Sequence, residues 1–567
     1  MDRSKSLAVG MALATWVLFA AASALHAQST EPFDVAVSES YEGNFQTSCS
    51  SCAEAACPVC DSGCLTDCGC GTCCWGHWVD WSVVPESIRP MPRPGNFPFP
   101  RQGCGYYTLC DQLRGICRDK PPQNGYPPFA LMASPFYDAD FRYVENLDVA
   151  EQSLAERLKR IPLNDCMTFS TGGQFWARFH NEHNSRLTET DNSYTLAHVR
   201  IYGDLLIGDR VRLFGEYLWA DSFSEELAPL PIDVDRGDAL NLFVELNLFD
   251  YDGKPVFARV GRQELLFGSQ RLISPLPWAN TRRTFDGVKL FRNGEKWDVD
   301  LFYTAFVPPA ANDFSQADDD REFGGAWTTY RPQKGHFVDL YYLYFDNSNA
   351  VTQQSIVRAP TESHTVGSRY AGDRCGYLWD VEAALQFGDQ GGQDLFAGMA
   401  TVGVGRNFKE ACWSPTVWFY YDYASGDSDP TTGDAHTFNQ LFPFGHYFLG
   451  WMDLVGRQNI HDVNAHLIFY PQPWLTVWLQ YHHFWLDQSQ DALYNAGGVA
   501  YRRDPSGAAG THVGDEFDIV LNFHLTKNSD ILVSYNKLYG GGFLEATSSP
   551  TEASDAETLY LMFQQKW

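Results

Sequence analysis

The feature that most constrains the fold is an alternation of apolar and polar residues that recurs from about Cys166 to Trp567. Segments of roughly ten residues alternate in this way, and clusters of Gly, Asp or Asn separate them. In the first segment, one face carries Phe169, Thr171, Phe175, Ala177 and Phe179, and the other carries Ser170, Gln174, Trp176, Arg178, His180 and Glu182. With roughly 22 to 25 residues per strand and loop, this pattern predicts about 16–18 strands, enough to enclose an aqueous lumen.

A soluble sandwich also alternates, but the number of repeats favours a membrane barrel. After the N-terminus, no segment offers eighteen consecutive apolar residues, so a spanning helix is not expected there. A membrane protein built from strands must close into a barrel, because an open sheet would leave backbone N–H and C=O groups unpaired in lipid. The mean hydropathy of −0.30 agrees with this, since half of each barrel strand faces water. We therefore predict an all-β domain over residues 137–567, a single transmembrane antiparallel β-barrel.

The last segment and the first one both point to the outer membrane of a double-membraned bacterium. The final strand carries Leu559, Leu561, Phe563 and Trp567 on one face, and such an aromatic ending resembles the signal read by the barrel-assembly machinery. At the other end, Arg3 and Lys5 precede an apolar stretch from residue 7 to about 25, followed by small residues. This order is that of a cleavable signal peptide over residues 1–27, with an uncleaved anchor as the alternative.

Residues 28–136 form a cysteine-rich and proline-rich extension that we expect on the periplasmic side. It holds nine cysteines between positions 49 and 74, namely Cys49, Cys52, Cys57, Cys60, Cys64, Cys68, Cys70, Cys73 and Cys74. Their Cys-x-x-Cys spacing also occurs in metal sites, but an exported chain meets an oxidising compartment, which favours disulfides. Nine is odd, so one thiol has to pair with a later cysteine or another chain. The residues 85–100 predict an extended linker, and Val144 to Leu158 a short amphipathic helix before the first strand.

One block of the barrel resembles a known family. It is Gly261-Arg262-Gln263-Glu264-Leu265, followed by Gly268, Gln270-Arg271-Leu272-Ile273, Trp278-Ala279-Asn280 and Arg283-Thr284-Phe285-Asp286-Gly287-Val288. This string, together with Tyr421 to Asp427, Thr437 to Pro443 and Gly450 to Leu454, closely resembles the alginate-export family of outer-membrane barrels. The resemblance covers residues from about 137 to the end. It implies a monomeric barrel whose basic interior passes an anionic uronate polymer across the outer membrane.

The same block is the most basic part of the chain, and it supplies most of the candidate pathway residues. Between positions 259 and 292, seven cations face only Glu264 and Asp286. Guanidinium groups bind carboxylates as planar forks, which suits a wall that contacts a polyuronate. The candidates for the substrate pathway are Arg178, Arg200, Arg259, Arg262, Arg271, Arg282, Arg283 and Lys289. The alternative is that these cations pair with strand carboxylates such as Asp204, Glu216 and Glu245 and simply fill the lumen.

Register restricts these assignments. If Val256, Ala258 and Val260 face lipid, Arg259 points inward, whereas strict alternation sends Arg262 to the lipid face. An inward Arg262 needs a bulge or a strand end at Gly261. The segment from Gly268 to Trp278 contains two prolines and predicts an inward-folding or periplasmic loop. In the late strands, Trp478, Gln480 and His482 take the inward register without an arginine.

Two acidic loops carry only weak indications of a metal-binding site. Asp318-Asp319-Asp320 is best explained as solvated surface. Asp427, Asp429 and Asp434, with Gly433 nearby, offer oxygen ligands of the kind that Ca²⁺ takes. They lack the spacing and the terminal Glu of an EF-hand, so the alternatives are a calcium site and plain solvated loop, and we expect no other cofactor.

Charge and motifs exclude several function classes. The formal charge of −29 argues against nucleic acid, whose phosphates need a basic surface. The chain has no Gly-x-Ser-x-Gly, no His-Glu-x-x-His and no phosphate-binding glycine loop, so we do not expect an enzyme. The predicted function is an outer-membrane channel for an anionic polysaccharide or oligosaccharide. The alternatives are a porin-like channel for small solutes, and a structural protein anchored by its cysteine-rich extension.

Overall fold

The computed structural model describes residues 103–127, 134–548 and 554–567. Three of the sequence predictions fall outside these residues: the signal peptide at 1–27, the nine cysteines between Cys49 and Cys74, and the linker at 85–100. Within the described part of the chain, no helix is both long and apolar enough to cross a membrane.

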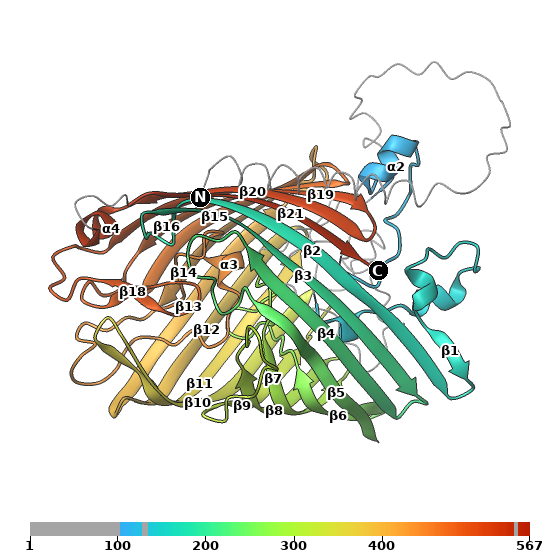
Figure 1. Cartoon of the computed structure of the whole chain (residues 1–567), viewed down its shortest axis with the longest axis horizontal. Coiled ribbons are helices and arrows are strands. Elements are labelled where there is room, and N and C mark those ends of the chain that lie inside the picture. Colours follow the sequence, from blue (N-terminus) through green and yellow to red (C-terminus); the bar gives the residue numbers. More distant parts are fainter. Residues whose placement is uncertain (1–102, 128–133, 549–553) are drawn as a thin grey trace, which may run out of the picture.

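A closed ring of eighteen antiparallel strands dominates the molecule (Figure 1). The main sheet has nineteen strands, of which the short β1 (Ile161–Asn164) pairs only with β2 and the other eighteen make the ring. The ring closes where β2 pairs with both β3 and β21. Its strands are β2 (Met167–Ser185), β3 (Thr190–Ile207), β4 (Val211–Phe223), β5 (Asp235–Tyr251), β6 (Lys254–Gln263), β7 (Thr284–Asn293), β8 (Trp297–Val307), β9 (Arg321–Tyr330), β10 (His336–Gln353), β11 (Ile356–Arg374), β12 (Tyr377–Gln390), β13 (Gln393–Asn407), β14 (Thr416–Ala424), β15 (Ile460–Gln472), β16 (Leu475–Trp485), β19 (His512–Thr526), β20 (Ser529–Gly540) and β21 (Ala556–Lys566). The strand number lies at the upper end of the predicted range.

The two ends of the barrel differ in their connections. At one end the strands join through short turns, and β1 and the C-terminal residue lie at this end (Figure 1). At the other end lie long loops, the hairpin β17 (Ala492–Tyr494) with β18 (Ala500–Arg503), and α4 (Gly542–Thr547). In outer-membrane barrels the short turns face the periplasm and the long loops face the exterior.

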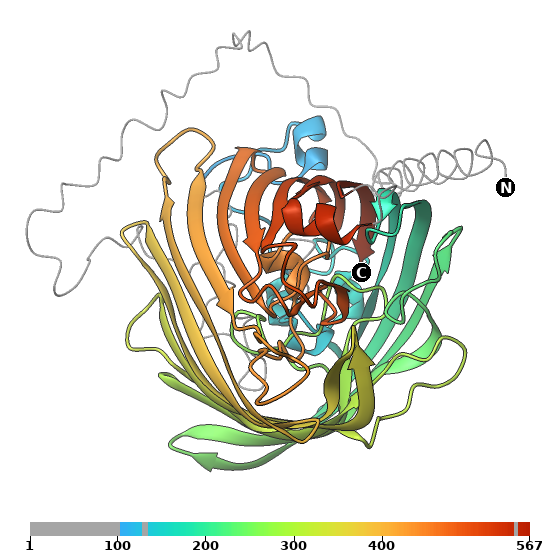
Figure 2. The same cartoon turned by 90° about the vertical axis from the view of Figure 1, so that its left-hand side faces the viewer.

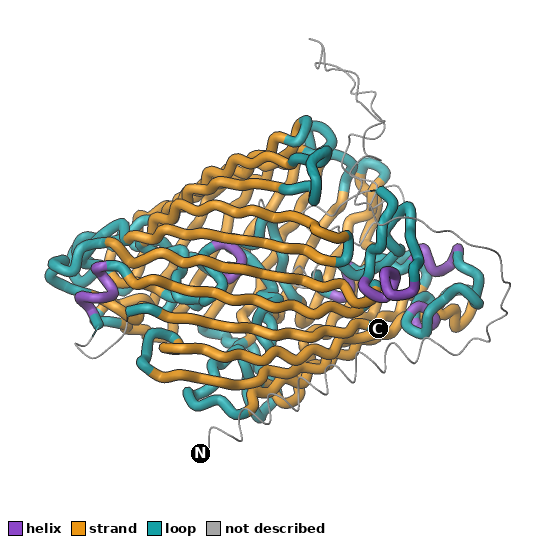
Figure 3. Tube along the Cα trace, turned by 90° about the horizontal axis from the view of Figure 1, so that it is seen from above, coloured by secondary structure: helices purple, strands orange, loops and turns teal. Residues whose placement is uncertain are grey.

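The wall follows the alternation that the sequence predicts. Strands run side by side around the molecule, and the helices of the described residues lie at its ends and inside it (Figure 3). Large apolar side chains project outward and are exposed, for example Leu242, Val260, Val402 and Phe419. Alternate residues face the lumen and are mostly polar and buried, which is how a barrel shields its interior from lipid.

Two long loops fold into the lumen and fill it. The loop 264–283 joins β6 to β7, and the loop 425–459, which contains α3 (Gly445–Phe448), joins β14 to β15. The loops pair with each other, because the backbone N–H of Ser274 donates to Phe442 and the N–H of Phe442 donates to Leu272. Viewed toward one end of the barrel, chain segments occupy the interior of the ring (Figure 2). The predicted inward-folding loop between Gly268 and Trp278 is part of this filling.

The residues before the barrel enter its short-turn end. Aromatic residues of this segment, Phe136, Tyr137 and Phe141, pack against the lumen-facing Tyr202 and Phe214. The described residues before the barrel contain α2 (Leu109–Arg114) and three 3-10 turns, η2 (Phe136–Asp138), η3 (Arg142–Asn146) and η4 (Glu156–Leu158). We call residues 134–147 the entry segment.

The predicted amphipathic helix from Val144 to Leu158 is wrong, since only η3 and η4 occur there. Tertiary contacts explain the difference. The Glu156 carboxylate accepts from the Ser153 backbone N–H (2.9 Å) and from Lys527 Nζ (2.6 Å), which lies in the turn between β19 and β20. These bonds hold Glu156 against the wall instead of on a continuous helix.

The cysteines that the structure describes form no disulfide with one another. Cys110 is buried, and Cys104, Cys117, Cys166 and Cys375 are exposed. The pairing of the nine earlier cysteines stays a prediction.

Candidate solute pathway in the barrel lumen

Strand carboxylates lie within bonding distance of most of the predicted pathway arginines. Arg200 Nε donates to Glu216 Oε1 (2.6 Å), and Arg259 Nε donates to Glu245 Oε2 (2.9 Å). Asp204 pairs instead with Arg212, which the sequence analysis did not select (2.8 Å). The ion pairs with Glu216 and Glu245 that the alternative interpretation predicts are therefore present in the structure. Across β3 to β6, the wall carries matched charges rather than a bare basic surface.

The entry segment covers these matched pairs with aromatic rings. The guanidinium of Arg200 lies 4.1 Å from the ring centre of Phe136, and that of Arg259 lies 4.2 Å from the ring centre of Tyr137. Both guanidiniums are almost completely buried. Because a cation over an aromatic face is attracted to it, the covered wall binds the segment by charge as well as by apolar area.

Arg271 fastens the loop 264–283 to the opposite wall. Its NH2 group donates to Asp380 Oδ2 (2.7 Å) and its NH1 group donates to Glu382 Oε2 (3.0 Å), both on β12. Asp380 also accepts from Arg369 Nε (2.6 Å). The side chains of Arg271 and Asp380 are fully buried, so this network holds the loop across the lumen. Arg271 therefore lies within the lumen as an anchored residue with two carboxylate partners.

The other end of the same loop rests on β2 and β3. His198 contacts the carbonyl of Asn280 through Nδ1 (2.9 Å), and Arg178 donates to the carbonyl of Trp278 (3.0 Å). Arg282, close by, donates to Glu264 Oε1 (2.5 Å) within the loop itself. The loop thus spans the lumen from β12 to β2.

Arg262 on β6 and Lys289 on β7 point to opposite faces of the barrel wall. Lys289 faces the lumen and lies 3.5 Å from the carboxylate of Asp300. Arg262 lies opposite Leu242 and Asp286 in a ladder that runs without a register shift through Gly261. Opposite residues in a ladder share a face, and Leu242 is 60% exposed. Arg262 therefore shares the outward face, as strict alternation predicts.

Partners at the rim neutralise the outward Arg262. Its Nε donates to Asp286 Oδ1 (2.8 Å), its NH1 group donates to Asp238 Oδ2 (3.1 Å), and its NH2 group donates to the carbonyl of Ser315 (2.9 Å). The loop that contains Ser315 covers the guanidinium, so an arginine on this face is kept out of lipid.

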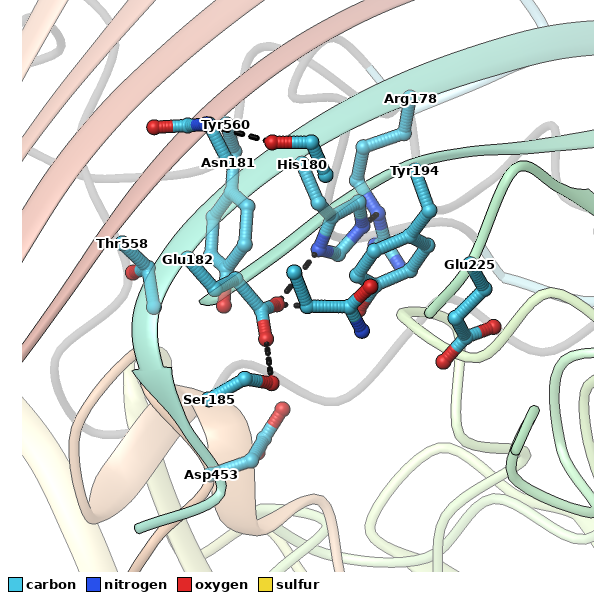
Figure 4. A network of polar contacts seen from close by, with 12 residues as sticks. Arg178, His180, Asn181, Glu182, Ser185, Tyr194, Glu225, Asp453, Thr558 and Tyr560 are labelled. Atoms are coloured by element: carbon cyan, nitrogen blue, oxygen red, sulfur yellow. Dashed lines mark hydrogen bonds and ion pairs between the residues drawn. The ribbon is translucent and has the colours of Figure 1, made fainter. Parts of the chain in front are cut away.

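Arg178 differs from the paired arginines, and Figure 4 shows its surroundings. Its Nε donates to His180 Nε2 (2.6 Å), which leaves the ring proton on Nδ1 to donate to Glu182 Oε1 (3.1 Å). Glu182 also accepts from the Tyr194 hydroxyl (2.9 Å). The Arg178 guanidinium therefore reaches a carboxylate only through a neutral histidine, and it stacks 3.6 Å from the ring centre of Trp278.

Arg283 is a second pathway candidate that bonds no carboxylate in the described part of the chain. Its NH1 group donates to the carbonyls of Pro443 (3.1 Å) and Ser274 (3.3 Å), where the two lumen loops meet. Burial lowers the pKa of the Arg283 guanidinium to about 9, because desolvation disfavours its charged form. It still carries its charge at neutral pH, and a carboxylate that reached it would be strongly attracted.

The acidic loop that suggested calcium is organised by hydrogen bonds of its own. Asp427 accepts from the backbone N–H groups of Asp429 (2.9 Å) and His436 (3.1 Å), and Asp429 accepts from the Thr431 hydroxyl (3.1 Å). Among the described residues, Asp427, Asp429 and Asp434 are not a group whose ligand atoms lie together. The calcium site stays a prediction.

Several lumen residues that form polar contacts were not among the candidates selected from the sequence. Arg457 donates to Asp422 Oδ1 (2.6 Å) and fastens the loop 425–459 to β14, while His482 Nδ1 lies 2.8 Å from Asp462 Oδ2 between β16 and β15. Alternation indicates that Asp422, Asp462 and His482 face inward. It carries no signal for Arg457, which comes from an irregular loop.

Comparisons with known proteins fit this architecture. The family model described as alginate export matches residues 167–555, more than half of the chain. A search of curated protein sequences finds no match. Among the solved structures that the chain matches is OpdO of Pseudomonas aeruginosa, at 12% identity and a TM-score of 0.45, covering 70% of this chain and 97% of that one. OccK8 (OprE) of the same organism has 10% identity and a TM-score of 0.47, covering 70% and 98%. Its OpdK, solved with vanillate, has 11% identity and a TM-score of 0.47, covering 71% and 98%.

The resemblance seen in the block around Gly261 is thus confirmed over most of the barrel. Strand pairing closes an eighteen-stranded wall whose inward face is polar, and such a wall belongs in an outer membrane. The protein is an outer-membrane channel that belongs to the alginate export family.

Proposed function

We propose that this channel passes an anionic, uronate-type polysaccharide or oligosaccharide, and that Arg178 and Arg283 contact its carboxylates. One observation carries the proposal: these two buried guanidiniums bond carbonyls and a histidine, whereas the other lumen-facing pathway candidates have carboxylate partners. A uronate carboxylate would supply the missing counter-charge in fork geometry.

The position of the two arginines supports a shared path. Arg178 contacts the carbonyl of Trp278 in the loop 264–283, and Arg283, at the end of this loop, contacts Pro443 in the loop 425–459. Both cations therefore lie beside the loops that fill the lumen, where a passing solute has to displace protein contacts.

The proposal includes the surroundings of the barrel. We place the cysteine-rich extension in the periplasm, because the entry segment inserts at the end with the short turns. The barrel would work as a monomer in outer-membrane lipid after insertion by the barrel-assembly machinery, without a catalytic role.

Planar-bilayer recording tests the proposal directly. Oligouronate should block the current at lower concentration than a neutral oligosaccharide of equal length. Arg178→Gln and Arg283→Gln should each raise the blocking concentration at least about tenfold, because one charge-assisted hydrogen bond contributes roughly 1.5–3 kcal/mol. Arg262→Gln is the matched control, since Arg262 lies on the outward face and is already paired.

A porin-like channel for small solutes is the second candidate, and the filled lumen favours it. The two loops contact β2, β3, β12 and β19, and their residues are buried, which leaves a polymer less room than a small molecule. Conduction with cation preference and no oligouronate block would overturn the polymer proposal and favour this one.

A further inference from the structure

The rim at the end with the long loops carries a cluster of histidine and aspartate side chains, away from the lumen. His483 lies near the end of β16, and His512 and Asp515 lie at the beginning of β19. The candidate ligand atoms of these three residues all lie within 4.8 Å of one another. We propose that His483, His512 and Asp515 form a site for a divalent transition-metal ion of the zinc type.

A β-bulge creates the cluster. Residues three apart on a regular strand point to opposite faces, so His512 and Asp515 should not meet. Here Asp515 lies opposite His483, whereas His512 lies opposite Trp485, and the register shifts between them. The extra residue turns His512 onto the face of Asp515, as bulges commonly re-aim a side chain. Gly514 has a φ of +151°, a conformation that side chains rarely adopt, so the local backbone depends on glycine.

The distances suit a small ion between the three groups. His483 Nδ1 lies 2.8 Å from Asp515 Oδ1, and His512 Nε2 lies 3.5 Å from Asp515 Oδ2. Zinc binds imidazole nitrogen and carboxylate oxygen at about 2.0–2.2 Å in a tetrahedron, which places neighbouring ligand atoms roughly 3.3 Å apart. The observed separations of the ligand atoms, from 2.8 Å to at most 4.8 Å, bracket that value.

The chemistry of the donors selects the kind of ion. Two imidazoles with one carboxylate suit zinc and its neighbours, whereas calcium and magnesium prefer sets made entirely of oxygen. The side chains of His483 and His512 are 41% and 48% exposed, so an ion can enter and keep a fourth position open. The Tyr481 hydroxyl donates to Asp515 Oδ1 (2.5 Å) and holds the carboxylate toward the histidines, a supporting contact typical of metal sites.

A neighbouring pair on the same rim offers a natural control. His461 on β15 contacts Asp487 through Nε2 (3.1 Å), with Tyr421 contacting its other ring nitrogen. This group has one histidine, one aspartate and one tyrosine, as the proposed site does, but it lacks the second histidine. A His–Asp contact alone therefore does not make the site; the bulge at Gly514 does.

Zinc titration of the full chain in detergent, with accessible thiols blocked by alkylation, tests the proposal. We expect the wild type to bind one more zinc ion than His512→Ala or His483→Ala, with affinity at this site reduced at least about tenfold by the loss of one of three ligands. His461→Ala should bind as the wild type does, and excess calcium should not compete. Equal zinc binding by the wild type and by both site variants would overturn the site.

A second measurement needs no variant. When copper bound at the site is reduced by ascorbate in air, the Cu(I) ion reduces dioxygen to reactive oxygen species, which oxidise the nearby histidine ligands. Mass spectrometry then locates the modified residues. Oxidation at His483 and His512, with His461 spared, supports the proposal. Oxidation spread equally over the three histidines contradicts it, whatever the folding of the variants.

Discussion

Buried charged side chains are paired differently on the two sides of the lumen wall. Along β2 to β7, arginines and a lysine alternate with glutamates and aspartates, and nearly every cation has a carboxylate partner. Along β15, β16 and β19, the acids Asp462, Glu516 and Asp518 face histidine, asparagine and glutamine, and no lysine or arginine of these three strands is among the buried residues described. Neither side therefore presents a purely basic or a purely acidic surface to a solute. Under the proposed function, selectivity would depend on Arg178 and Arg283, which bond no carboxylate among the described residues.

The largest effect should follow from removing a carboxylate that serves two arginines. Asp380→Ala would leave both Arg271 and Arg369 without their shared acceptor, and breaking a fully buried pair costs about 3–5 kcal/mol. We expect the loop 264–283 to detach and the conductance to rise. Thermal unfolding, read by mobility on gels, and single-channel recording measure the two effects.

Asp462→Ala on the other side is the matched control for Asp380→Ala. Its neighbours His482 and Asn464 can stay neutral, so the loss should be clearly smaller. Equal loss from both variants would mean that the two sides do not differ in the way proposed.

The next largest effect should come from uncovering the paired side. Phe136→Ala with Tyr137→Ala removes the rings that cover Arg200 and Arg259, and each truncation of a buried aromatic costs about 3–5 kcal/mol locally. Because the entry segment is only one layer on a closed wall, the barrel itself should stay folded. The expected result is faster proteolysis of the entry segment together with higher conductance. An unchanged conductance would show that the entry segment lies beside the solute path rather than in it.

A smaller effect is expected from acid. Burial alone would raise the pKa of Glu156, but the Lys527 ammonium and the Ser153 donors lower it below its ordinary value. A lowered folded-state pKa means that this contribution to stability is full above the unfolded pKa of about 4.3 and is lost as pH falls through the folded value. Protease sensitivity of residues 134–160 should therefore rise below about pH 4. Glu156→Gln should show that sensitivity at every pH, and a wild type that stays protected in acid would contradict this role.

The sequence could predict the wall far better than the contents of the lumen. Alternation with period two indicated the inward register of Arg178 and Trp478 and the outward register of Arg262, because side-chain direction in a strand is a local property. The partners of these residues are not local. Arg271 finds Asp380 more than a hundred positions away through an irregular loop, and no periodicity describes such a path. The bulge at Gly514 likewise moves His512 to a face that alternation denies it.

The smallest effect should come from Arg262, and it tests the difference between inner and outer faces of one strand. Arg259 and Arg262 are three positions apart on β6, so alternation puts them on opposite faces. Arg262→Ala leaves Asp286 and Asp238 without their partner, but Asp286 is about one third exposed and can hydrate. The reversal potential and the oligouronate block should therefore match the wild type, while the loop around Ser315, which loses its bond to the guanidinium, should become more sensitive to protease. If the block weakened as much as in Arg178→Gln, Arg262 would have to reach the solute path, and the outward register of β6 beyond Gly261 would be wrong.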